Sequence, residues 1–136
     1  MSQANVEIVR RVYEAAARRD TASVLALYDP EVELDNSALA VVGWGGGVYR
    51  GHDGLRNFFR EWHEAWETVD YDFNELIDAS GEFVISVVSR HARGRASGAD
   101  VGLDLALVWT IRDHKVCRVV WFPTREAALQ AVGLRE

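Results

Sequence analysis

Two consecutive β-strands are predicted by the sequence Leu103-Asp104-Leu105-Ala106-Leu107-Val108-Trp109-Thr110-Ile111-Arg112, the pair Asp113-His114, and the run from Lys115 to Phe122. Both runs are rich in β-branched and aromatic residues, and the Asp-His pair is typical of a turn. Because side chains alternate across a strand, the odd-numbered residues from Leu103 to Ile111 share one face, which is entirely apolar. We expect that face to point into the core, which places Asp104 on the outer face.

The same period of two extends backward from this pair of strands and gives way to a helical period near the N-terminus. Further strands are predicted over 32–35, 71–77 and 82–96, with turns at Ser80-Gly81 and Ser97-Gly98. Helices are predicted over 3–19, 21–28, 53–67 and 124–132, with Asp20 and Asp53 as N-caps, a stop at Asp29-Pro30 and a C-cap at Gly133. A glycine-rich loop covers 36–51. Helices followed by an antiparallel meander indicate an α+β fold, and we expect one domain over residues 1–136.

The charge balance of the chain argues against nucleic acid as a partner. The net charge is −6 over 136 residues, whereas surfaces that follow a phosphate backbone are usually basic. The N-terminus lacks the basic and apolar regions of a secretory signal, and no apolar run approaches the ~20 residues that span a bilayer. We therefore expect a cytoplasmic protein without a membrane partner. Cys117 is the single cysteine, so no intrachain disulfide can form.

Five tryptophans in so short a chain indicate an apolar ligand cavity, because large rigid aromatics often line such cavities. They fall on a predicted loop, one helix and two strands. We expect a cavity of at least ~300 Å³. Its predicted substrate-binding residues are Trp44, Tyr49, Phe59, Trp62, Trp66, Leu107, Trp109 and Trp121. For Trp121 the alternative position is the outer face of the sheet.

Four segments of the chain resemble the nuclear transport factor 2-like superfamily, and within it the SnoaL-like group. They are Leu27 to Val32, Tyr49 to Phe59, Val108 to Val116 and Glu126 to Leu134. The resemblance implies a cone-shaped, cystatin-like fold, in which a curved antiparallel sheet wraps around the N-terminal helices and leaves a deep apolar pocket. It also implies a homodimer through the outer sheet face. Members include polyketide cyclases, ketosteroid isomerases, dehydratases and epoxide hydrolases, so fold alone does not identify the reaction.

The isomerase design places a tyrosine on the first helix, a base aspartate after the first strand and an acid on a late strand. Counting along this sequence puts these positions at Val12, Asn36 and Leu107, with Tyr13 and Asp35 one residue away. A leucine can neither move a proton nor donate a hydrogen bond. The sequence therefore disfavours an isomerase of that design.

The register of the long strand over 82–96 decides which polar residues enter the cavity. If the odd-numbered residues face inward, His91 can act as a general base that Asp35 orients; if a bulge shifts the register, Arg90 points inward instead. We predict Asp35, His91 and Tyr13 as catalytic residues, with a surface position as the competing interpretation of His91. His63 and Glu67 read as a solvated i, i+4 pair.

The four histidines have no ligand spacing, and no cofactor motif is present, so we expect neither a metal nor a cofactor. The leading hypothesis is a protein that binds a small apolar organic molecule and processes it by cofactor-independent acid–base chemistry, as a cyclase, isomerase, dehydratase or hydrolase. The alternative is a non-catalytic ligand-binding or dimeric structural module.

Overall fold

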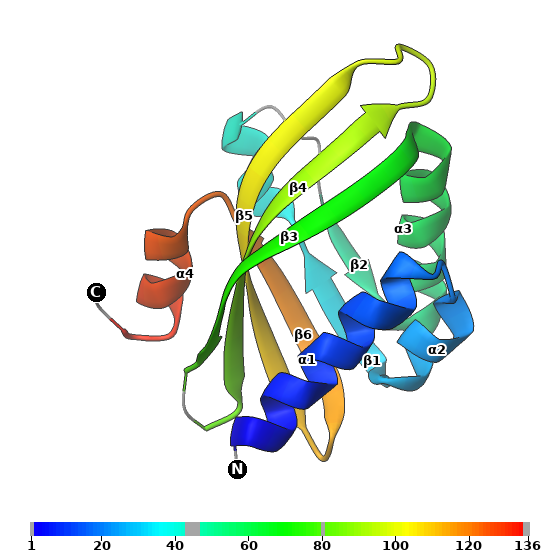
Figure 1. The fold of residues 1–136 in the computed structure, drawn as a ribbon. Helices are drawn as coiled ribbons and strands as arrows, with labels where there is room; N and C mark the ends of the chain where they lie inside the picture. The colour runs from blue at the N-terminus through cyan, green and yellow to red at the C-terminus, as the bar shows by residue number, and fades with distance from the viewer. Residues whose placement is uncertain (1, 43–46, 80, 135–136) are drawn as a thin grey trace.

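A curved, unclosed sheet of six strands wraps around the N-terminal helices (Figure 1). The computed structural model describes residues 2–42, 47–79 and 81–134. The helices are α1 (Ser2–Ala17), α2 (Thr21–Ala26), α3 (Gly51–Ala65) and α4 (Arg125–Ala131), with a 3₁₀ helix over Ser37–Val42. The strands are β1 (Tyr28–Asp35), β2 (Val48–Arg50), β3 (Trp66–Asp78), β4 (Phe83–Gly94), β5 (Asp100–Arg112) and β6 (Lys115–Phe122). The predicted α+β class and curved sheet are confirmed.

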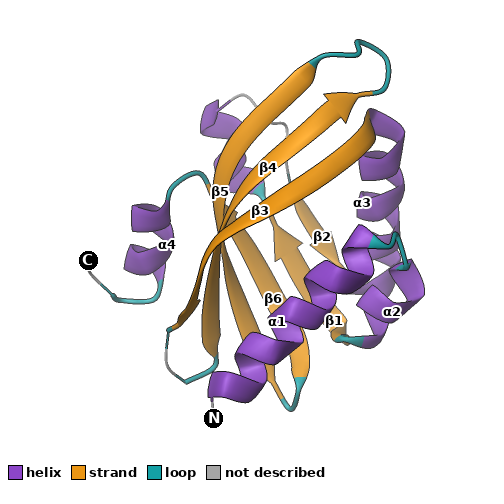
Figure 2. Ribbon diagram, in the orientation of Figure 1, coloured by secondary structure: helices purple, strands orange, loops and turns teal. Residues whose placement is uncertain are grey.

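The strand order is β2-β1-β6-β5-β4-β3, so β2 and β3 form the two edges (Figure 2). Strands β3 to β6 form the predicted antiparallel meander, and β1 joins β6 in the parallel direction. The pairing of β1 with β6 is interrupted between Tyr28 and Glu33. Pro30 lies in this interruption, where a residue without an N–H donor removes no hydrogen bond from the sheet.

The main core lies between the inner face of the sheet and the first three helices. From α1 it receives Ile8, Val9, Val12 and Tyr13, which recur at helical spacing and are all buried. From β5 it receives Leu105, Leu107, Trp109 and Ile111, so the predicted inward face of that strand is confirmed. The polar cap of α2 is also confirmed, because the Asp20 carboxylate accepts hydrogen bonds from the Ser23 backbone N–H and hydroxyl.

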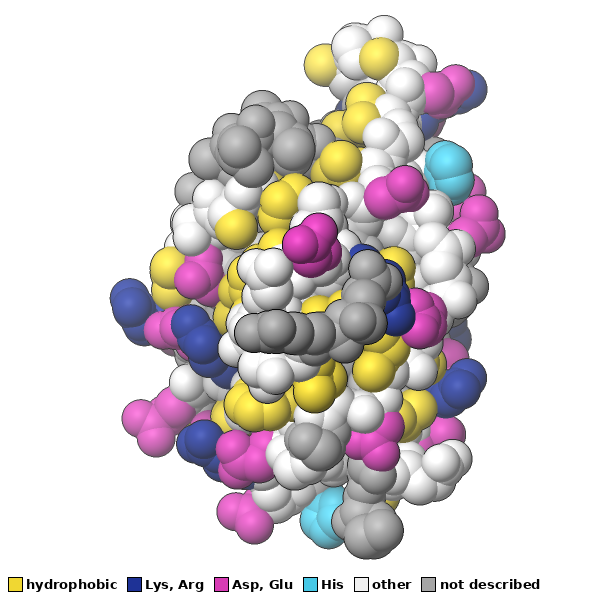
Figure 3. All heavy atoms as spheres, turned by 90° about the vertical axis from the view of Figure 1, so that its left-hand side faces the viewer, with side chains coloured by type: hydrophobic (Ala, Val, Ile, Leu, Met, Phe, Trp, Pro, Cys, Tyr) yellow, Lys and Arg dark blue, Asp and Glu magenta, His cyan; other side chains and the backbone are white. Residues whose placement is uncertain are grey.

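A second apolar cluster lies on the outer face of the sheet, beneath α4. Ala128 and Leu129 of this helix pack on Ile85 of β4 and on Ala106 and Val108 of β5. The side of the molecule that carries α4 shows hydrophobic side chains among charged ones (Figure 3). Helix α4 begins at the Thr124 cap and ends before Gly133, whose φ of 79° is the left-handed conformation typical of a helix C-terminus.

Two predicted boundaries around α3 are wrong. The helix begins at Gly51 and ends at Ala65, so Asp53 lies in its first turn and does not cap it, and Trp66 begins β3. The β3 strand starts five residues before its predicted start at 71, because it pairs with the full length of β4 from Trp66–Gly94 onward. The last aromatic residue of the helix is therefore Trp62.

The turn between β5 and β6 was predicted correctly and has an uncommon geometry. Asp113 and His114 have φ angles of 51° and 63°, which places both residues in the left-handed region. Two such residues in succession form the type of tight turn whose twist matches that of an antiparallel strand pair. This turn aligns Arg112 with Lys115 and Ile111 with Val116, and the register shifts beyond that point, between Ile111 and Thr110.

Candidate functional site

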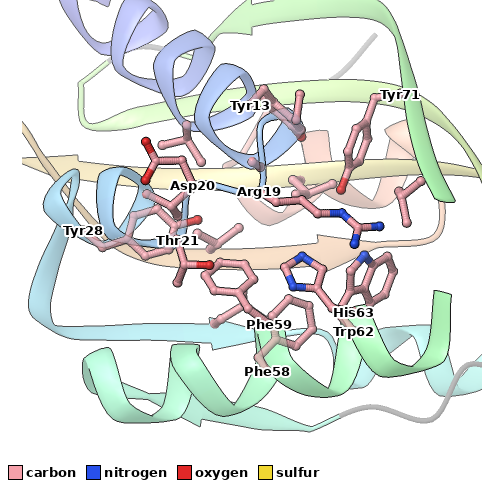
Figure 4. Close-up of a pocket in the computed structure, with 18 of the residues that line it drawn as sticks. Tyr13, Arg19, Asp20, Thr21, Tyr28, Phe58, Phe59, Trp62, His63 and Tyr71 are labelled. Atoms are coloured by element: carbon pink, nitrogen blue, oxygen red, sulfur yellow. The ribbon is translucent and has the colours of Figure 1, made fainter. Parts of the chain in front are cut away.

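The first three helices and the inner face of the sheet enclose a cavity of about 110 Å³ (Figure 4). Its walls are mostly aromatic and aliphatic, with a small group of polar side chains. The aromatic lining residues are Tyr13, Tyr28, Phe58, Phe59, Trp62, Tyr71, Trp109 and Trp121, and the charged or polar ones are Arg19, Asp20, Thr21, His63 and Arg90.

The cavity is smaller than the sequence predicted. Small-molecule sites usually measure ~300–1,000 Å³, so the expectation of at least ~300 Å³ is wrong. The aromatic rings pack against one another and fill much of the space: the Phe58 ring stacks on Trp62, and both lie 5.7–5.9 Å from the Trp121 ring. An engineered cavity of roughly 150 Å³ accommodates benzene. The present cavity is smaller than that, so one ring is the largest ligand it holds as it stands, and a larger ligand has to displace side chains.

Arg90 is the residue that most distinguishes this cavity. Its side chain points inward from β4 and is only 2% exposed. The guanidinium carbon lies 4.5–4.7 Å from the ring centroids of Trp62, Tyr71 and Trp121. Among the described residues, its Nε and Nη1 atoms have no hydrogen-bond partner. A guanidinium is always charged in proteins, so the cavity contains a buried cation.

The environment of Arg90 offsets only part of the cost of burying it. Taking an ion out of water costs several kcal/mol even after relaxation of the protein. A cation–π contact contributes about 0.5–2 kcal/mol. No ion pair of Arg90 with a described carboxylate exists. An anionic group in the cavity would therefore gain an unusually strong partner.

The inward position of Arg90 corrects the preferred register of the long strand. The odd-numbered residues of β4 face outward, and the alternative in which Arg90 faces the cavity is the correct one. The error has a physical reason. Phe83, Ile85 and Val87 are apolar because the cluster beneath α4 covers them, and this made the outer face of the strand resemble an inner one.

A buried hydrogen-bonded group holds Tyr13 in the cavity wall. The Tyr13 hydroxyl lies 2.9 Å from the Ser86 hydroxyl, and the same Ser86 oxygen accepts a hydrogen bond of 2.9 Å from Trp109 Nε1. The Tyr13 ring also meets the Tyr71 ring edge-on at 5.4 Å. Burial raises the pKa of Tyr13 well above its ordinary value. Tyr13 is therefore a neutral hydroxyl that can donate a hydrogen bond and does not act as a base near pH 7.

Arg19 and His63 lie near each other in the lining of the cavity (Figure 4). The Arg19 guanidinium donates to the Glu67 backbone oxygen at 2.9 Å, and Arg95 donates to the backbone oxygen of His63 at 3.0 Å. Burial, together with the positive charges of Arg19 and Arg95, lowers the pKa of His63. The imidazole is therefore neutral near pH 7 and can accept a proton.

The sequence does not identify His63 as a lining residue, because the predicted helix continues to residue 67 and pairs His63 with Glu67. The helix ends at Ala65, so Glu67 lies on β3 and is not one turn above His63. The position of His63 in the sequence does indicate its place in the lining. It follows Trp62 directly and lies one helical turn after Phe59, and both of these residues were predicted to line the cavity.

Of the predicted substrate-binding residues, five line the cavity: Phe59, Trp62, Leu107, Trp109 and Trp121. The outward alternative for Trp121 is wrong, since its side chain is buried against the helices. Trp66 lies behind the lining, with its ring 5.9 Å from that of Trp62. Tyr49 packs on Phe58 and donates a hydrogen bond to Glu61. The prediction for Trp44 falls outside the described residues.

The structure does not bring Asp35 and His91 together. The His91 side chain is 61% exposed, and its Nε2 lies 3.6 Å from Asp72 on the neighbouring edge strand. Asp35 accepts hydrogen bonds from the Ser37 backbone N–H and hydroxyl. Their strands, β1 and β4, are separated in the sheet by β6 and β5. The predicted pair is wrong as a geometric arrangement, and neither residue is among the described residues that line the cavity.

The other two positions of the isomerase design carry no acid or base. The Asn36 carboxamide accepts a hydrogen bond from the Gly47 backbone N–H, and Leu107 is a buried apolar wall residue. Asp20 is the one carboxylate among the described lining residues, and it is engaged as the cap of α2. No group of three His, Cys, Asp or Glu side chains in the described part of the chain is placed to hold a metal ion.

Within the described residues, no helix has both the length and the apolar character needed to cross a membrane. Cys117 is partly buried, and its thiol approaches the Thr110 backbone oxygen at 3.4 Å, away from the cavity. Burial raises the pKa of this thiol above its ordinary value. Cys117 is not among the described residues that line the cavity.

Comparison with known proteins agrees with the fold. A family model described as a SnoaL-like domain matches residues 9–119. A solved NTF2-like protein of unknown function from Burkholderia pseudomallei K96243 is 24% identical, with 96% of this chain and 98% of that chain covered and a TM-score of 0.78. TerC, co-crystallised with polyporic acid, is 24% identical, with 95% and 98% covered and a TM-score of 0.76.

A candidate SnoaL-like polyketide cyclase from Shewanella putrefaciens CN-32 is 12% identical, with 87% and 88% covered and a TM-score of 0.73. No curated protein sequence matches this chain. At these identities the solved structures establish the fold that the chain shares with them.

Proposed function

Because this chain belongs to the SnoaL-like domain family, we propose that its cavity binds a small, largely apolar organic molecule and processes it by acid–base chemistry without a cofactor. The observation that carries the proposal is the cavity itself, whose aromatic walls enclose a neutral hydroxyl, a neutral imidazole and a buried guanidinium. Apolar walls with a few convergent polar groups are typical of small-molecule sites.

The polar residues divide into complementary roles. His63 is the group that accepts a proton, because it lines the cavity and its lowered pKa keeps the imidazole neutral. Tyr13 donates a hydrogen bond to an oxygen of the ligand, since its raised pKa keeps the proton on the phenol. When a proton leaves a carbon beside a carbonyl group, it passes to His63, and the negative charge that develops on the oxygen is stabilised by Tyr13 and Arg90.

Of the catalytic residues predicted from sequence, we carry Tyr13 forward. Asp35 and His91 give way to His63 and Arg90, since only the latter pair lines the cavity. Isomerisation, cyclisation and dehydration beside a carbonyl group include a proton transfer of this kind, whereas in hydrolysis the proton that passes to the base comes from water. The co-crystallisation of TerC with an acid, and the presence of a candidate polyketide cyclase among the similar structures, support an organic ligand.

The second candidate function is non-catalytic ligand binding. It is favoured by Leu107 at the expected acid position and by the engagement of Asp20, the one carboxylate among the described lining residues, in a helix cap. A carrier protein needs an apolar pocket and a polar group that binds one end of the ligand. The aromatic rings form the pocket, and Arg90 is the polar group.

Ligand screening followed by turnover assays separates the two candidates. Trp62, Trp109 and Trp121 line the cavity, so tryptophan fluorescence should respond to binding. An enzyme converts a bound compound, and conversion falls by 10²-fold or more in His63→Gln and Tyr13→Phe. His91→Gln serves as the matched control because its imidazole is 61% exposed.

Loss of turnover in His91→Gln, with full activity in His63→Gln, would contradict the assignment. Binding without conversion of any compound favours the carrier. Failure of every small apolar compound to bind would reject both functions.

We also propose a homodimer through the outer face of the sheet. The supporting feature is the set of partly buried apolar side chains beside α4, including Val87 and Phe122. Sedimentation equilibrium tests this, since a monomer at micromolar concentration would contradict it. The cytoplasmic location stays a prediction that microscopy of the tagged protein can test.

A further inference from the structure

Three buried nitrogen atoms around the cavity lack a hydrogen-bond acceptor. Among the described residues they are Arg90 Nε, Arg90 Nη1 and Trp121 Nε1. The Arg90 guanidinium carbon lies 4.5 Å from the centroid of the Trp121 ring, and both side chains line the cavity. Native proteins rarely leave buried donors unpaired, and such groups require a specific explanation.

All three atoms are donors, so what they require is an acceptor. Arg90 is a cation, and a charged acceptor forms a much stronger bond with it than a neutral one. No described residue provides that acceptor: Leu107 is neutral, and the Asp20 carboxylate accepts hydrogen bonds from Ser23. The donor set is therefore arranged for an anion that comes from outside the chain.

The aromatic neighbours restrict the shape of that anion. The ring centroids of Trp62, Tyr71 and Trp121 all lie within 4.7 Å of the guanidinium carbon, so the aromatic rings cover the faces of the guanidinium. An acceptor then has to approach at the edge of the guanidinium, with the remainder of the ligand against aromatic walls. Together with the cavity volume of about 110 Å³, this favours a flat molecule of about one ring.

The charged residues that line the cavity are more often positive than negative, although the whole chain has a net charge of −6. Arg19 and Arg90 line the cavity, and Arg95 donates hydrogen bonds to the backbone oxygens of His63 and Trp66. The lowered pKa of His63 has the guanidiniums of Arg19 and Arg95 among its causes, after burial. Asp20 is the opposing charge among the described lining residues. A local excess of positive charge in a cleft attracts anions and excludes cations.

We propose that the ligand of this cavity is a small, flat organic monoanion, whose carboxylate or ionised hydroxyl oxygen accepts hydrogen bonds from Arg90 and Trp121. The inference rests on the proposed function and specifies the substrate class for the same site. It assigns Arg90 as the specificity-determining residue, because one buried cation balances one negative charge.

Paired binding measurements with benzoate and benzamide test the assignment. The two probes have nearly the same size and shape, and they differ in charge. Isothermal titration of the full chain should give a Kd for benzoate at least tenfold below that for benzamide, which corresponds to about 1.4 kcal/mol. Arg90→Met replaces the guanidinium with an apolar side chain of similar length and should abolish the preference for benzoate. Arg90→Lys keeps the positive charge and should retain part of that preference.

Arg93→Met is the matched control, because Arg93 lies on the same strand with its side chain 52% exposed and paired with Asp100. It should retain the full preference for benzoate. Circular dichroism of every variant confirms that each one is folded.

Equal affinity for both probes in the wild type would overturn the assignment of an anion while leaving the binding of small apolar molecules intact. A preference that survives in folded Arg90→Met would equally overturn it. If neither probe binds at millimolar concentration, the inferred ligand class is wrong, and the screen of apolar compounds then decides the proposed function separately.

Discussion

Replacement of Ser86 by alanine removes one oxygen atom that serves two buried partners. Ser86 is 0% exposed, and its hydroxyl lies 2.9 Å from both the Tyr13 hydroxyl and Trp109 Nε1. A buried donor that loses its acceptor costs about 1–3 kcal/mol, and the net loss of a further hydrogen bond costs about 0.5–1.5 kcal/mol. We therefore expect Ser86→Ala to lower the free energy of unfolding by about 1.5–4.5 kcal/mol.

Urea denaturation monitored by circular dichroism measures this loss. Ser89→Ala is the matched control, because the Ser89 hydroxyl also makes two hydrogen bonds, with Asn74 and Asp104, but on the outer face where water can replace them. We expect the control to change stability by less than about 1 kcal/mol. Equal losses in the two variants, or a loss below about 1 kcal/mol in Ser86→Ala, would refute the argument that burial makes the Ser86 group costly to disrupt.

Three further predictions concern other parts of the molecule. Arg90→Met should leave the free energy of unfolding unchanged or raise it, since an apolar side chain replaces a buried cation without a described ion pair; a fall above about 1 kcal/mol in thermal or urea unfolding would contradict this. His63→Gln should reduce the loss of stability on acidification below pH 6.5. The unfolded chain protonates His63 there before the folded chain does, so stability falls as the pH falls; an unchanged pH profile of unfolding would argue against a lowered pKa. Thr124→Ala should cost about 1 kcal/mol, because the Thr124 hydroxyl caps α4 by accepting from the Ala127 N–H at 3.1 Å; urea titration checks this value, and Thr124→Ser should restore most of it.

Periodicity identified most of the fold because the signals were local. The odd-numbered apolar face of β5, the Asp113-His114 turn and the Asp20 cap each follow from a few neighbouring residues. The extension of β3 back to Trp66 depends on pairing with β4, which is a contact between distant segments that periodicity does not encode.

The site was harder to predict because it depends on which face of β4 points inward. Arg90 was correctly placed only in the alternative register, since the packing of α4 gives the outer face of β4 its own apolar residues. The position of His63 was also hard to predict. The predicted helix ran two residues past its actual end at Ala65, which paired His63 with Glu67 instead of placing it in the cavity lining. The aromatic residues were predicted better, as large apolar side chains on inward faces have few other positions to occupy.

The most direct test of the account follows the Arg90 side chain itself. In a ¹⁵N-labelled sample, the Nε–H signal of Arg90, assigned through its loss in Arg90→Met, is recorded during a titration with benzoate. We predict a downfield shift of this signal together with that of the Trp121 indole N–H, since both donors gain an acceptor. Saturable binding of benzoate that leaves both signals unmoved would contradict the claim that these donors form the ligand site.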